Sequence, residues 1–141
     1  MKRDSKLSLA LHALGHMANA PDRALRSEEL AQIGPTNPVV VRRVLGLLRD
    51  AGLVTSAKGH DGGWRLAHAA TDISVADVYS AVGEPFFRKP ATGPDNPPHC
   101  AIERALQSTM QNALARAEAA LKADLAQFSI ADLAQGMHPH G

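Results

Sequence analysis

The sequence is poor in cysteine and contains no long apolar run. Its 141 residues include one cysteine, Cys100. A single thiol excludes an intrachain disulfide and any metal cluster held only by the cysteines of one chain. A reducing cytoplasm is the simplest compartment for such a chain. No stretch approaches 18 uninterrupted apolar residues, so we expect no membrane-spanning helix.

Net charge is also low, at +1, but the charges are unevenly divided. Residues 1–70 carry ten Lys and Arg against six Asp and Glu, a net charge of +4. Residues 71–141 carry five against eight, a net charge of −3. This asymmetry predicts a partner with a phosphate backbone for the first half only.

The N-terminal stretch superficially resembles a signal peptide. Two basic residues precede "LSLALHALGHMA", and "ANA" follows at the position of a cleavage site. However, His12 and His16 interrupt the apolar run. Its apolar residues also fall at helical spacing: Leu7, Ala10, Leu11, Leu14 and Met17. We therefore predict an amphipathic core helix over residues 5–19.

A second pair of helices is predicted from capping signals. Ser27 is expected to cap a short helix that ends at Gly34 and Pro35. Asn37 is expected to cap the next one, with Pro38 at its first position. Its buried stripe would be Val41, Val44, Leu45 and Leu48, and its opposite face Val39, Arg42, Arg43 and Gly46. Gly52 is expected to end this helix in the left-handed conformation.

The segments that follow predict a hairpin and a long helix. "LVTSA" and "WRLA" are the arms of a β-hairpin, joined by the glycine-rich loop "KGHDGG". Ser74 and Asp77 form a capping box for a further helix. A stretch with five prolines then runs to residue 99, and a long amphipathic helix is predicted from Cys100 to about Gln127.

The order helix, turn, capped helix, hairpin is that of a winged helix-turn-helix. We therefore predict a mainly α fold with a small β-hairpin wing and a long C-terminal dimerisation helix. The predicted divisions are a DNA-binding domain over 1–84, a proline-rich loop over 85–99, a dimerisation region over 100–135 and a tail over 136–141.

This order predicts contact with double-stranded DNA. The major groove admits one α-helix, and a helix entering end-on presents its N-terminal turns to the bases. A basic hairpin beside it can lie along the backbone or in a minor groove. The candidate DNA-binding residues are Thr36, Asn37, Val39, Arg42, Arg43, Lys58, His60 and Arg65. The competing interpretation is that the paired arginines form a solvated face.

One long segment also resembles a known family. "SEELAQIGPTNPVVVRRVLGLLRDAGLVTSAKGHDGGWRLA" is similar to the DNA-binding region of the Rrf-two (Rrf2) family of bacterial winged-helix regulators. The match is carried by an "LA" in the short helix and by the pattern "LxxLxxAGLVxSxxGxxGG(Y/W)xLA" over residues 45–67. "ISVADVYSAVGE", residues 73–84, continues the resemblance, which weakens beyond Glu84.

The resemblance implies a transcriptional regulator that binds a pseudo-palindromic operator as a homodimer. Because a small one-domain dimer usually acts by blocking polymerase, we expect a repressor rather than an activator. The residues support dimerisation independently, because a helix of about 42 Å is too long to bury its stripe on so small a domain. The expected interface residues are Ile102, Leu106, Met110, Ala113, Ala117 and Leu121. The alternative is a winged-helix module that binds only proteins.

The sequence departs from the family at its cofactor ligands. Cluster-binding members use three closely spaced cysteines, so this chain resembles the cluster-free branch, and we expect no cofactor. Some relatives add a ligand from the first helix of the partner subunit, where His12 lies here. His12 and His16 have a metal-compatible spacing but lack an evident third ligand, so solvent-exposed histidines are the simpler interpretation.

Cys100 is the remaining candidate for chemistry. A helix start and the neighbouring His99 favour a reactive thiolate, which makes Cys100 a candidate redox sensor. The alternative is a small buried apolar residue at the dimer interface. A Cys100–His99 catalytic pair is disfavoured, because adjacent helical side chains diverge, and we predict no enzyme. An effector could instead be a small molecule. Trp64 is expected to pack at the base of the wing.

Overall fold

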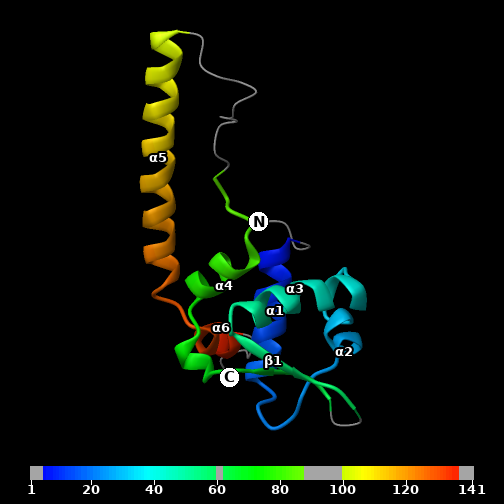
Figure 1. The fold of residues 1–141 in the computed structure, drawn as a ribbon. Coiled ribbons are helices and arrows are strands. Elements are labelled where there is room, and N and C mark those ends of the chain that lie inside the picture. Colours follow the sequence, from blue (N-terminus) through cyan, green and yellow to red (C-terminus); the bar gives the residue numbers. More distant parts are fainter. Residues whose placement is uncertain (1–4, 60–61, 88–99, 137–141) are drawn as a thin grey trace.

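The computed structural model describes residues 5–59, 62–87 and 100–136 (Figure 1). In chain order its elements are α1 (Lys6–Ala18), α2 (Ser27–Ala31), α3 (Pro38–Asp50), β1 (Val54–Ala57), β2 (Gly63–Leu66), a short 3-10 turn (Ala70–Asp72), α4 (Val75–Val82), α5 (Ala101–Leu125) and α6 (Ile130–Gly136). The mainly helical class, the two-stranded wing and the long C-terminal helix are as predicted. Within these ranges no helix has both the length and the apolar character that a membrane crossing requires.

Helix α1 forms the centre of the body, and α3, α4 and α6 pack around it (Figure 1). Its inward residues Ala10 and Leu14 are fully enclosed, and Leu7 and Met17 are buried above and below them. Ser5 caps the helix by accepting a hydrogen bond from the Ser8 N–H at 3.1 Å. The amphipathic core helix predicted from the N-terminal periodicity is therefore confirmed.

Helix α3 begins and ends at the residues that the sequence indicated. The Asn37 side chain accepts hydrogen bonds from the N–H groups of Val39 and Val40, at 3.0 and 3.1 Å. At the other end Gly52 has a φ of +80°. The N–H of Leu53 returns to the Leu48 carbonyl at 2.9 Å, which closes a Schellman motif. The four apolar residues of the predicted stripe are all buried.

The prediction for the start and end of α2 was wrong. The residue in the capping position is Arg26, in extended backbone, and its N–H donates to Glu29 Oε1 at 3.3 Å. Ser27 is the first helical residue and is 6 % exposed. Its hydroxyl is engaged by a partner 37 residues away rather than by the helix end. The helix also stops at Ala31, before Gly34 and Pro35.

The wing is an antiparallel pair of short strands. Ser56 lies opposite Trp64, and Thr55 lies opposite Arg65. The segment before α2 adds a further bridge, because Leu25 and Trp64 exchange backbone hydrogen bonds at 2.8 and 3.0 Å. Gly63 makes this approach possible: its φ is +135°, and a Cβ there would lie 2.7 Å from the Leu25 carbonyl oxygen.

After α5 the chain returns to the body. Ile130, at the start of α6, is completely buried, and its N–H donates to the Ile73 carbonyl at 2.8 Å. Helix α6 then packs against α1. Helix α5 itself extends well beyond the rest of the described chain (Figure 1). The core of the winged domain thus includes Ile130, from the C-terminal part of the sequence.

Candidate nucleic-acid interface

Helix α3 has one face in the core and one face in solvent. The buried stripe fixes the helix, and Leu45 and Leu48 are fully enclosed. The opposite face carries Val39, Arg42, Arg43 and Gly46 at positions i, i+3, i+4 and i+7. Val39 is 59 % exposed, and both arginines are exposed. The N-terminal turns of α3 therefore present one apolar and two cationic side chains to solvent, on a helix anchored by its other side.

The two arginines differ in their surroundings. Arg42 forms an ion pair with Glu28 of α2, with 3.5 Å between Nη2 and Oε1, and both side chains are more than half exposed. An exposed pair of this kind contributes about 0–1 kcal/mol, so a phosphate group can replace the carboxylate. Among the described residues, Arg43 has neither an ion pair nor a hydrogen bond. Arg43 is therefore the arginine whose guanidinium is available without breaking a contact.

The residues just before α3 are less well placed to contact DNA. Asn37 uses its side-chain oxygen to cap the helix. The hydroxyl oxygen of Thr36 is enclosed and has no partner among the described residues. The predicted DNA contacts of Thr36 and Asn37 therefore gain no support from the geometry, although Asn37 sets where the helix begins.

Two of the three DNA-binding residues predicted in the wing are exposed to solvent. Lys58 is exposed just after β1, and Arg65 is exposed on β2. Arg65 also borders a groove of about 430 Å³ with Arg23 and His68. His60 lies outside the described residues. The structure thus leaves Lys58 and Arg65 available to solvent without bringing them onto the surface of α3 itself.

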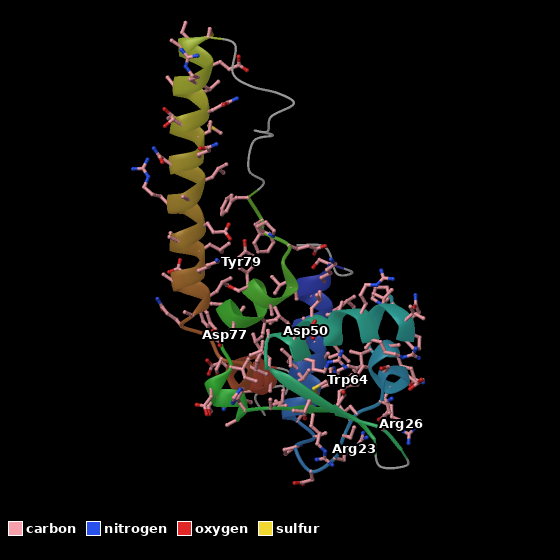
Figure 2. The ribbon with its side chains drawn as sticks, viewed as in Figure 1. Arg23, Arg26, Asp50, Trp64, Asp77 and Tyr79 are labelled. Atoms are coloured by element: carbon pink, nitrogen blue, oxygen red, sulfur yellow. The ribbon has the colours of Figure 1, made fainter. Side chains whose placement is uncertain are left out.

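Trp64 holds the wing against the helices, as its predicted packing role required. The residue is 9 % exposed, and its indole Nε1–H donates to the Ser27 hydroxyl at 3.1 Å. The guanidinium of Arg49, at the end of α3, lies 5.7 Å from the centre of the ring. Trp64 pairs with Ser56, next to the loop end of the two strands, and Figure 2 shows it close to α2. The Trp64 side chain therefore adds contacts to α2 and α3 to the backbone bridge that Trp64 forms with Leu25.

Helix α5 also has two faces, and they serve different surfaces. Leu121 and Leu125 are half-buried against the core of their own domain. Glu118 accepts a hydrogen bond from the Tyr79 hydroxyl at 3.1 Å, at the junction with α4 (Figure 2).

At the far end of the helix, Ile102, Leu106 and Met110 are 81 %, 59 % and 44 % exposed. At 100° per residue these three lie on an adjoining face, together with Ala113 and Ala117. Of the predicted interface residues, only Leu121 packs on its own domain.

Tyr79 and Cys100 lie near the two ends of the proline-rich stretch. The Tyr79 hydroxyl accepts a hydrogen bond from the Phe86 N–H at 3.0 Å, and the two rings stack. Burial raises the pKa of Tyr79, so it remains a hydrogen-bond donor over the physiological range. Cys100 is exposed and is the capping residue of α5, where its Sγ accepts from the Glu103 N–H at 3.4 Å.

His12 and His16 have no third metal ligand grouped with them in the part of the chain that the structure describes. His12 Nδ1 lies 2.7 Å from the Ser8 carbonyl oxygen, which identifies Nδ1 as the protonated nitrogen. His12 is exposed, and His16 is partly buried. No group of three or more His, Cys, Asp or Glu with metal-binding geometry occurs among the residues that the structure describes. His12 is therefore a surface residue of α1, whereas His16 is only partly accessible to solvent.

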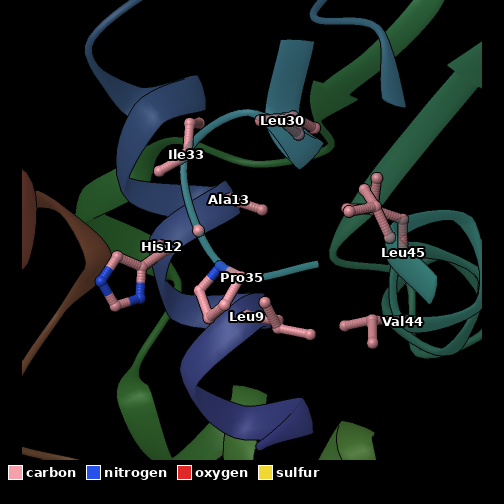
Figure 3. Close-up of a pocket in the computed structure, with 10 residues that line it drawn as sticks. Leu9, His12, Ala13, Leu30, Ile33, Pro35, Val44 and Leu45 are labelled. Carbon is pink, nitrogen blue, oxygen red and sulfur yellow. The ribbon is translucent and has the colours of Figure 1, made fainter. Parts of the chain in front are cut away.

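A small pocket lies between α1, α2 and α3 (Figure 3). It is lined mainly by apolar side chains, including Leu9, Leu30 and Val44, with His12 at its edge. Its volume is about 30 Å³, which accommodates a water molecule but no organic effector. It is therefore a packing defect between the helices rather than a ligand site.

A well-capped helix with a solvent-facing basic turn, a preceding short helix and a hairpin wing define a winged helix-turn-helix regulator of transcription. The sequence profile of the Rrf2 family, described as iron-dependent transcriptional regulators, matches residues 3–136. The chain belongs to the Rrf2 family.

Individual relatives agree with this assignment. YwnA of Bacillus subtilis, named as an HTH-type transcriptional regulator, is 33 % identical over 132 residues, which cover 92 % of this chain and 95 % of YwnA. A crystal structure named as a transcriptional regulator from Lactobacillus plantarum superposes with a TM-score of 0.76, at 28 % identity, over 96 % of this chain and 91 % of that one. A structure named as a DNA-binding protein superposes with a TM-score of 0.75, at 32 % identity, over 92 % and 98 %.

The iron dependence in the family description does not fit the donors in the described part of the chain. The chain contains one thiol, that of Cys100 at the start of α5. Histidines and carboxylates do not assemble into a ligand set within the described ranges. Three thiolate ligands from one chain are ruled out by composition.

Proposed function

We propose that this regulator binds a pseudo-palindromic operator as a homodimer and represses transcription by excluding polymerase, in the cytoplasm. Each subunit places the N-terminal turns of α3 in a major groove and its wing along the adjoining backbone. The activity is regulation rather than catalysis. The proposal extends the family assignment to an assembly, a DNA geometry and particular residues.

The observation that carries the proposal is the two-sided character of α3. The helix is anchored by four buried apolar residues, while its first two turns expose Arg42 and Arg43. A groove-reading helix needs this combination, because base readout requires a side chain to be presented from a rigid position. Arg43 is proposed to contact a base, since it has no competing partner. Arg42 contacts a base or a phosphate once its ion pair with Glu28 is broken.

The wing supplies contacts that do not depend on sequence. Lys58 and Arg65 are exposed cations on a hairpin that Trp64 joins to α2. Such residues fit phosphate oxygens, which fix the register of the protein on the duplex. His60 is proposed to join them as part of the same loop.

Dimerisation is proposed through the uncovered face of α5. None of the residues of this helix is buried within the chain. The apolar residues Ile102, Leu106, Met110 and Ala113 are exposed and are not packed against the core of their own domain. A symmetry-related copy of the same helix offers a matching surface. This places the two winged domains on one body and produces the two-fold symmetry that a pseudo-palindrome mirrors.

Control of binding is proposed to act through oxidation of Cys100, at the start of α5, or through a small ligand bound between the winged domain and the dimer helix. Cys100 is exposed, so its thiol is accessible to peroxide or to a small disulfide. DNA affinity of the wild type and of Cys100→Ser, each reduced and then treated with peroxide, separates the two. Loss of affinity on oxidation in the wild type alone supports the redox route, and equal affinity in all four samples leaves a ligand as effector.

The alternative, a winged-helix module that binds only proteins, is not favoured. Relatives that match nearly the whole chain are named as transcriptional regulators, and one solved structure is named as a DNA-binding protein.

A salt titration tests the assignment of Arg43. Arg43→Ala should weaken binding to an operator by about 1–3 kcal/mol and reduce discrimination against random DNA. Lys58→Ala should weaken both DNAs alike and reduce the salt dependence. Arg104→Ala, which removes the same charge from α5, serves as the matched control and should bind as wild type. Equal losses on both DNAs for Arg43→Ala would remove it from base readout.

A further inference from the structure

We propose that Val39 is a specificity-determining residue that recognises the C5-methyl group of a thymine in the major groove. The inference rests on the proposed DNA-binding function and deepens it by assigning a base to an apolar side chain. It follows from two residues on the exposed face of α3 that the fold itself does not explain.

A valine at position 39 is less favourable for the stability of the isolated chain than an alanine would be. Its side chain is 59 % exposed in the first turn of α3, and it is not among the residues packed against the core. A β-branched side chain loses rotational freedom in a helix, so alanine would serve the helix better. The neighbouring Val40, by contrast, packs partly against the core. Packing within the chain therefore accounts for Val40 and leaves Val39 unexplained.

Gly46 has the same property two turns later on the same face. Glycine in a helix interior is less favourable than alanine because it loses more backbone entropy on folding. A Cβ at Gly46 would meet nothing within 4 Å, so no neighbour inside the chain requires a glycine there. Two residues that are worse than alanine for the helix thus share one surface. Departures of this kind are expected where a surface is shaped for a partner.

The flanking charges identify the partner as DNA rather than an apolar protein surface. Arg43 lies four residues after Val39, so their side chains are neighbours on the helix. Arg42 flanks the same face, and the wing adds Lys58. In the major groove, thymine alone presents an apolar group, and guanine presents the two acceptors that arginine binds. Val39 and Arg43 together therefore predict a thymine close to a guanine in each half-site, with Gly46 allowing the helix to approach closely.

Replacement of thymine by uracil tests the inference, because it removes only the methyl group. An operator is first obtained by selection from a random pool. Each thymine of a half-site is then changed to uracil in turn, and affinities of the wild type, Val39→Ala and Val39→Thr are measured. Wild type should lose about threefold to tenfold at one thymine of the half-site, the effect of exposing one buried methyl group. Val39→Ala should bind the thymine and uracil duplexes equally, and Val39→Thr, which keeps one methyl group, should retain most of the preference.

The outcomes separate this inference from the proposed function. Thymines outside the half-sites are the control and should tolerate uracil. Selective operator binding with no sensitivity to uracil, or an equal penalty in wild type and Val39→Ala, overturns the role of Val39 alone. Failure to select any sequence overturns the proposed function and the inference together. Because Val39 is exposed, neither variant should have a melting temperature much below that of the wild type, which a thermal scan checks.

Discussion

The indole Nε1–H of Trp64 donates a hydrogen bond of 3.1 Å to the Ser27 hydroxyl, and this contact joins strand β2 to the first turn of α2. The same ring lies beneath the guanidinium of Arg49 at the end of α3. The wing and both helices of the helix-turn-helix are therefore tied through one side chain. When α3 lies in a groove, these contacts also set where the wing residues Lys58 and Arg65 lie.

This relationship predicts a coupled effect on stability. Trp64→Phe leaves the buried Ser27 hydroxyl without its donor, and Ser27→Ala leaves the indole N–H without its acceptor. Each should lower the free energy of unfolding by about 1–3 kcal/mol. The double variant should lose less than the sum, because both changes remove the same bond. Urea denaturation of the four proteins measures this, and strictly additive losses would mean that the bond does not contribute.

Gly46→Ala should separate stability from binding. Alanine should raise the free energy of unfolding by about 0.5–1 kcal/mol, since the site has room for a Cβ and the helix favours alanine. Operator affinity should fall, because the added methyl group stands on the face proposed to approach DNA. Denaturation and a binding titration on the same samples provide both values. A stabilised variant with unchanged affinity would show that this part of α3 stays clear of the duplex.

Leu106→Asp should dissociate the proposed dimer. Leu106 is 59 % exposed in the chain, so a charge there should not disturb the subunit fold, but it would be buried without a partner between two helices. Gln111→Asp is the matched control, because Gln111 lies on the opposite face of α5, about 180° from Ile102. Sedimentation should show monomer for Leu106→Asp and dimer for Gln111→Asp. A dimer in both would place the interface elsewhere. Leu121 is less suitable, since it packs on its own core.

His16 should make folding stability depend on pH. Burial, and secondarily the positive charge of a protonated His12, hold the pKa of His16 below its ordinary value of 6.5. The unfolded chain then binds more protons than the folded chain below pH 6.5. Stability should therefore fall as pH drops through 6.5 and level off below the folded pKa. Denaturation at pH 7.5 and 5.5 should show a smaller loss for His16→Gln than for wild type. Identical losses would assign the pH dependence to other groups.

Local signals account for what the sequence predicted correctly. The ends of α3 are set by Asn37, Pro38 and Gly52, which act on backbone groups within a few residues. A hairpin with a glycine-rich loop and a capping box at Ser74 are equally local. Such features can be read directly because the residues that cause them are adjacent to the structure they form.

Contacts between distant residues account for what the sequence did not indicate. Ser27 looks like a helix cap, yet its hydroxyl serves Trp64, 37 residues away. The face of the helix predicts that Arg42 binds DNA, but the sequence does not indicate that Arg42 pairs with the carboxylate of Glu28. The periodicity of α5 marks apolar residues but does not say what covers them. The structure alone shows that Leu121 packs on the core while Leu106 does not.

The most direct test of the proposed function is selection of bound duplexes from a random DNA pool by the intact protein. The account predicts an inverted repeat whose half-site centres lie about 34–36 Å apart, one helical turn, or a multiple of that distance. The repeat should be lost for Leu106→Asp and kept for Gln111→Asp. Enrichment of a single unrepeated site by the wild type, or no enrichment at all, would contradict a dimer that reads DNA through two α3 helices.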